Sequence, residues 1–97
     1  MNEYEDAVYQ TDNYGQTELD RFRLLTALAG EVGELCNMVK KLKPGADMKP
    51  IVLELGDILW YTTALAHHFG TTLDDVADCN MRKVLSRKEQ GITYNAR

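Results

Sequence analysis

The strongest constraint in this chain is an acidic pattern that occurs twice, as Glu31-x-x-Glu34 and Glu54-x-x-Asp57, each time inside an apolar run. At i,i+3 spacing the two carboxylates of a pair share one face of a helix. Like charges placed so close repel each other, and burying them costs still more free energy. Mg²⁺ or Mn²⁺ resolves this conflict, because hard divalent cations prefer oxygen ligands and neutralise the charge. The alternative is that these acids are solvated charges on amphipathic helices. Two matched pairs favour a metal site.

Apolar residues recur at helical period along most of the chain, and no alternation typical of strands is present. The pattern predicts a short helix over residues 2–13 and a long one from a Thr17-x-x-Asp20 capping box to Lys43. A second long helix is expected over 50–70, and a last one from Thr71 or Thr72 to just before Gly91. The predicted fold class is all-α, with about four helices.

The short 44–49 connection favours antiparallel packing of the two long helices. The apolar stripe of the first centres near Val32 and Val39. Each acidic pair then has one carboxylate at the edge of the apolar stripe and one farther out, so that all four acids are able to converge between the helices.

The 50–70 helix is apolar on nearly all sides, with one stripe through Ile58 and Leu65 and another through Leu53 and Trp60. Such a helix requires burial all round, which a chain of 97 residues hardly supplies by itself. We therefore expect an antiparallel helical bundle that is completed by homo-oligomerisation, for which symmetric dimers are the commonest form.

Length and charge exclude several classes of protein. Residues 1–97 suffice for a single domain, and a net charge of −4 argues against binding to a nucleic-acid polymer. Two cysteines are too few for a disulfide framework, and no apolar stretch is long enough for a membrane span. We therefore expect a cytoplasmic protein with no membrane partner.

Polar residues on the last helix form a second candidate site. Asn80, Lys83 and Arg87 lie at i, i+3 and i+7, with Asn80 inside an apolar stripe, where a buried amide needs a hydrogen-bond partner. Lys83 and Arg87 are suited to phosphates, although basic side chains at a helix end are also common without a ligand. Trp60 is suited to stacking on a base, although core or interface packing is the commoner use of such a residue.

The segments that carry these residues resemble the MazG-type nucleoside triphosphate pyrophosphohydrolases, within the all-α NTP pyrophosphatase superfamily. The matching segments are GEVGELCNMVKK (30–41), ELGDILWYTTALAHHFGTTLDD (54–75) and NMRKVLSRKEQG (80–91). The family signature is E-x-x-E, a spacer, then E-x-x-D. Many members open the first motif with two glutamates, where this chain has Gly30-Glu31.

The resemblance implies Mg²⁺-dependent hydrolysis of a (deoxy)nucleoside triphosphate between the α- and β-phosphates, giving a monophosphate and pyrophosphate, in a nucleotide house-cleaning role. It implies that Glu31, Glu34, Glu54 and Asp57 bind the metal, with Glu34 or Asp57 positioning the attacking water. It also implies that the substrate contacts Asn80, Lys83, Arg87 and Trp60. The rival hypotheses are a non-catalytic helical adaptor and a protein that senses a metal or nucleotide without hydrolysis.

Overall fold

The computed structural model describes residues 2–91, which form helices and no strands. The helices are α1 (Asn2–Thr11), α2 (Glu18–Lys40), α3 (Lys49–His68) and α4 (Leu73–Glu89). The all-α prediction is confirmed.

The helix boundaries differ from the predicted ones by a few residues. α1 ends at Thr11 rather than at residue 13, and α2 ends at Lys40 rather than at Lys43. The predicted capping box at the start of α2 is present: the Asp20 amide donates to Thr17 Oγ1 over 3.1 Å, and the Thr17 amide donates to Asp20 Oδ2 over 3.1 Å. α3 ends at His68 rather than at Gly70, because Gly70 has φ +80°, a left-handed conformation that cannot continue a helix.

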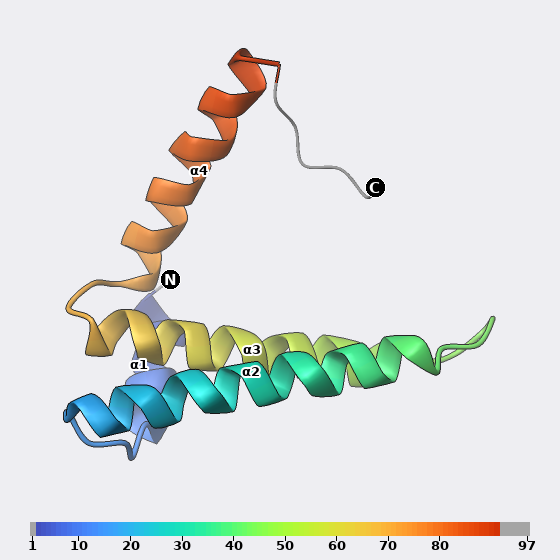
Figure 1. Ribbon diagram of the computed structural model, residues 1–97, viewed down its shortest axis with the longest axis horizontal. Coiled ribbons are helices and arrows are strands. Elements are labelled where there is room, and N and C mark those ends of the chain that lie inside the picture. The colour runs from blue at the N-terminus through green and yellow to red at the C-terminus, as the bar shows by residue number, and fades with distance from the viewer. Residues whose placement is uncertain (1, 92–97) are drawn as a thin grey trace.

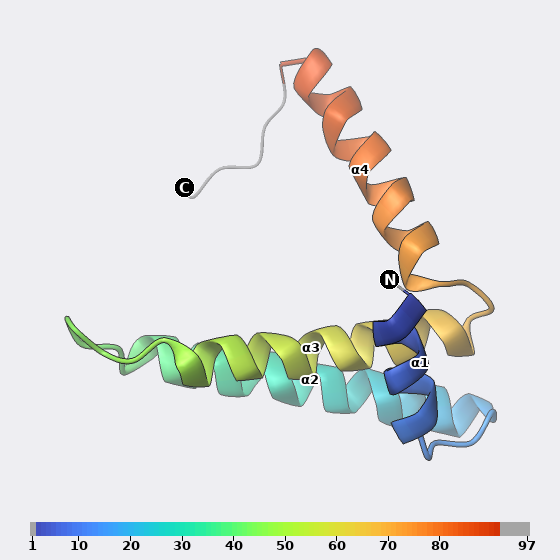
Figure 2. The same ribbon diagram turned by 180° about the vertical axis from the view of Figure 1, so that it is seen from behind.

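The long helices α2 and α3 form an antiparallel hairpin, joined at one end by residues 41–48 (Figure 1). α1 crosses the hairpin near the other end (Figure 2). α4 leaves that same end at a steep angle and extends away from the hairpin, so the four helices do not close into a bundle within one chain (Figure 1). None of the helices described is both long and apolar enough to cross a lipid bilayer.

The core lies where α1 crosses the hairpin. Val8 from α1, Leu24 from α2 and Ala64 from α3 are at most 1% exposed. Five aromatic residues and one leucine pack around them: Tyr4, Tyr9, Tyr14, Trp60, Tyr61 and Leu65. Burial of these large rings is the main apolar stabilisation of this end of the molecule.

Polar contacts attach α1 to both of its neighbours. His68 Nε2 lies 2.7 Å from Asp12 Oδ2, with both side chains almost completely buried. Glu5 Oε2 accepts hydrogen bonds from the Tyr9 hydroxyl, at 3.0 Å, and from the backbone amide of Leu73 at the start of α4, at 3.3 Å. α1 therefore holds the end of α3 and the start of α4 in fixed positions.

Much of the apolar surface is uncovered. Val32 and Val39, the predicted centre of the core-facing stripe on α2, are 42% and 51% exposed, so that prediction was wrong for the single chain. The apolar residues of α2 that are buried or half-buried are Leu24, Ala27, Leu28, Leu35 and Met38, because α3 packs against a face rotated away from Val32 and Val39. An exposed stripe of this kind is typical of a surface that contacts another protein.

Candidate metal centre

Three carboxylates from the two acidic motifs meet between α2 and α3. One ligand oxygen each from Glu31, Glu54 and Asp57 lie within 4.8 Å of one another. Antiparallel packing brings them together, since it sets the middle of α2 against the first half of α3. Glu31 is half-buried and Glu54 only 4% exposed, whereas Glu34 and Asp57 are exposed. Each motif thus supplies one inner and one outer carboxylate, as the spacing predicted.

Glu54 is the innermost member of the group. The hydrogen bond with Glu31 and the burial of its own carboxyl raise its pKa to about 7, and Glu34 adds to the effect. Among the described residues no donor reaches the buried Oε2 of Glu31 or of Glu54.

This donor set fits a hard divalent cation. It consists of carboxylate oxygens only, which suits Mg²⁺ or Mn²⁺ rather than a soft thiophilic metal. Two of these oxygens are buried and without a donor, an arrangement that costs free energy unless a proton or a cation compensates it. Glu34 lies outside the group of three, but close enough to Glu54 to raise its pKa.

A concave pocket of about 370 Å³ adjoins the carboxylates. Glu31 and Asp57 line one part of it, and Thr11, Trp60 and Tyr61 line the rest. Its volume lies toward the low end of the range for small-molecule sites, ~300–1,000 Å³. Of the residues predicted to contact the substrate, Trp60 is the one that lies beside these carboxylates in the structure.

The polar residues of α4 lie elsewhere in the single chain. Asn80 and Lys83 line a separate pocket of about 360 Å³ on α4, together with Thr71 and Cys79. The expectation that Asn80 is buried was wrong: it is exposed, because α4 extends away from the hairpin and no other helix covers it. Arg87 lies one further turn along α4, farther from the hairpin.

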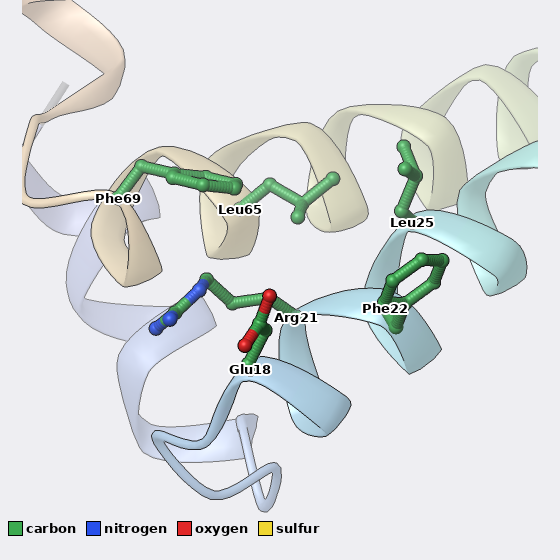
Figure 3. Close-up of a pocket in the computed structure, with 6 residues that line it drawn as sticks. All are labelled: Glu18, Arg21, Phe22, Leu25, Leu65 and Phe69. Carbon is green, nitrogen blue, oxygen red and sulfur yellow. The ribbon is translucent and has the colours of Figure 1, made fainter.

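Another pocket of about 370 Å³ lies at the open end of the hairpin and contains none of the four motif acids. Leu65 of α3 and Phe69, the C-cap residue after it, face Phe22 and Leu25 of α2 across it (Figure 3). The Arg21 guanidinium lies 5.7 Å from the Phe69 ring centroid. Its walls are mostly apolar, and Glu18 is the one acid among the residues that line it.

Sequence reasoning missed Thr11, because the 2–13 segment carries no motif and resembles the family only weakly. The sequence contains only an indirect indication of a role for Thr11. Thr11 ends a short helix rich in tyrosine, and such a helix needs an apolar partner to be stable.

The fold and the carboxylates define an all-helical protein with an acidic centre suited to a divalent metal. Residues 20–92 match the MazG nucleotide pyrophosphohydrolase domain, and the chain belongs to this family. It is also similar to the Gene 37 protein of Mycobacterium phage L5, with 36% identity over 72 residues. The aligned part covers 67% of this chain and 63% of the phage protein. No solved structure matches the chain.

Proposed function

We propose that this protein hydrolyses nucleoside triphosphates at the α–β phosphate bond, with Mg²⁺ or Mn²⁺ as cofactor, to a nucleoside monophosphate and pyrophosphate. One observation carries the proposal. In a chain of the MazG family, the two acidic motifs bring three carboxylate oxygens within 4.8 Å of one another. A house-cleaning role, the removal of unwanted nucleotides from the pool, follows as part of the same proposal.

In this proposal Glu31, Glu54 and Asp57 hold the cation, with Glu31 and Glu54 on the inner side and Asp57 on the outer side, and Glu34 completes the set. A bound divalent cation supplies neutralisation of the triphosphate charge and lowers the pKa of a coordinated water. Phosphoryl chemistry depends mainly on positioning and charge stabilisation, so no serine or cysteine nucleophile is needed.

The two exposed acids have the catalytic role. Glu34 and Asp57 lie on the outer side of the cluster, where a water molecule approaches from solvent. One of them accepts a hydrogen bond from the attacking water and orients it toward the α- or β-phosphorus. Trp60 stacks on the base of the substrate. Asn80, Lys83 and Arg87 lie apart from the acids in the single chain, so in this proposal they bind the substrate where association brings α4 of another subunit to the pocket.

The test is a panel of NTPs and dNTPs incubated with Mg²⁺ and resolved by anion exchange, with EDTA as control. We expect monophosphate and pyrophosphate, and no products when EDTA is present. Diphosphate and orthophosphate would keep the metal site but refute α–β cleavage. No turnover of any nucleotide would favour a sensor or an adaptor, and thermal stabilisation by Mg²⁺ would then separate the sensor from the adaptor.

We further propose that the protein functions as a homodimer or homotetramer. Val32 and Val39 on α2 and Leu53 and Leu55 on α3 are between 42% and 59% exposed in the single chain, which is more apolar surface than a monomer usually leaves in water. Association would also allow another subunit to pack on α4 and bury Asn80.

This proposal predicts that light scattering after size exclusion gives a mass of two or four chains. Val39→Glu should reduce that mass, because a charge placed in an apolar interface loses its hydration without gaining a partner. The matched control is Asp6→Asn at an exposed position of α1, outside the apolar surfaces of α2 and α3, which should leave the mass unchanged. A monomeric native protein would refute association.

A further inference from the structure

The end of α1 forms part of the wall of the pocket beside the acids. Trp60 Nε1 donates a hydrogen bond to Thr11 Oγ1 over 2.9 Å, and the same two residues line this pocket with Glu31 and Asp57. Thr11 lies nine positions before residue 20, where the family match begins. A residue outside the matched domain thus contacts a wall of the candidate substrate pocket.

The hydroxyl of Thr11 is held in one orientation. Its hydrogen is donated to the carbonyl oxygens of Ala7, at 2.8 Å, and Val8, at 3.1 Å. A lone pair of Oγ1 therefore remains to accept the hydrogen from the indole. α1 in turn is fixed to α3 by the buried Asp12–His68 contact, so the acceptor for Trp60 is held in a rigid position.

The indole ring of Trp60 is fixed by two contacts. Thr11 holds its Nε1 atom, and the Tyr61 ring lies nearly perpendicular to it, with 4.9 Å between ring centroids and 77° between ring planes. The indole has one polar hydrogen, and it is donated to the Thr11 hydroxyl oxygen. Trp60 therefore offers a ligand its π-face and no free donor.

We propose that Thr11 is a positioning residue that holds Trp60 as a stacking wall for the nucleobase of the substrate. This inference rests on the proposed function, and it makes α1 part of the substrate site. Because stacking uses the face that every base has, this wall tolerates different bases and distinguishes them weakly. Base preference must then come from other groups in the pocket.

The test uses Trp60 as its own reporter, because it is the chain's single tryptophan. Indole fluorescence is titrated with α,β-methylene analogues of a purine and a pyrimidine triphosphate in the presence of Mg²⁺. The variants are Thr11→Val, which removes the acceptor at nearly constant shape, and Thr11→Ser, which keeps it. Thr26→Val is the matched control, because the Thr26 hydroxyl also donates to a carbonyl of its own helix, at 2.8 Å, whereas the indole Nε1 of Trp60 donates to Thr11.

We expect Thr11→Val to weaken binding of both analogues about three- to tenfold, the range for loss of one hydrogen bond, with KM raised similarly and kcat within about twofold. Thr11→Ser and Thr26→Val should bind like the native protein. Native affinity in Thr11→Val would overturn the proposal, as would a Thr11→Ser variant as weak as Thr11→Val. The absence of any fluorescence change in the native protein would also overturn it.

The outcomes for the two proposals are distinguishable. If the native protein binds the analogues through Trp60 but hydrolyses no nucleotide, the proposed activity fails and the role of Thr11 stands. If it hydrolyses nucleotides and Thr11→Val has a native KM, the role of Thr11 fails and the activity stands.

Discussion

Asp57→Asn is expected to reduce turnover of nucleoside triphosphates by about 10²-fold or more, the loss typical when one group that stabilises charge in a transition state is removed. The substitution keeps the shape of the side chain and removes one charge from the group with Glu31 and Glu54. Because Asp57 is exposed on the outer side of α3, its loss should leave the fold intact. The measurement is steady-state release of pyrophosphate, with helical content followed by circular dichroism.

The matched control is Asp6→Asn, the same chemical change at an exposed position of α1 that does not line the pocket beside the acids. It should have native kcat and KM. Glu34→Gln should resemble Asp57→Asn, since the proposal gives these two acids the outer positions. Native activity in both Asp57→Asn and Glu34→Gln would remove the assignment of the catalytic site.

The stability of the protein is expected to depend on pH in opposite directions with and without Mg²⁺. The pKa of Glu54 is raised to about 7 by its hydrogen bond with Glu31, by burial and by Glu34. A raised carboxyl pKa means that the folded state holds a proton which the unfolded state loses above its ordinary pKa. This stabilisation is complete below the ordinary pKa of a glutamate and is lost as the pH rises through about 7.

Without metal, the melting temperature should therefore fall between pH 6 and pH 8. With millimolar Mg²⁺ it should rise over the same interval, because the cation competes with the proton and stabilises the deprotonated cluster. The difference made by Mg²⁺ at pH 8 should be on the order of 5 °C and smaller at pH 6. Differential scanning calorimetry in both conditions measures it.

Glu54→Gln tests whether ionisation of Glu54 causes this pH dependence. This variant cannot ionise at position 54, so its melting temperature without metal should change less between pH 6 and pH 8 than that of the native protein. Equal pH dependence in Glu54→Gln and in the native protein would show that another group is responsible. A native melting temperature unaffected by Mg²⁺ at pH 8 would contradict the metal site itself.

The all-α class and the placement of each acidic pair on one helix face were predictable from local sequence. Helical period depends on neighbours within a few positions, so the apolar spacing in residues 18–40 and 49–68 indicated two long helices. The capping box at Thr17 was visible for the same reason, because its two partners are three residues apart.

Other features escaped sequence reasoning because they depend on how whole helices pack. The rotation of α2 about its axis decides that Leu24 is buried while Val32 and Val39 are exposed, and a helical pattern does not reveal which apolar face the partner helix covers. The direction of α4 decides that Asn80 is exposed, although its neighbours in sequence are apolar.

The sequence by itself determined the helices, the four acids and their spacing, because these follow from residue type and from contacts within one or two helical turns. Only the tertiary structure decided which oxygens of Glu31, Glu54 and Asp57 meet, and that Thr11 holds Trp60 from 49 positions away. Such contacts are fixed by the packing of α1 and α2 on α3. That packing depends on the sum of many weak side-chain contacts along whole helices, which no single motif encodes.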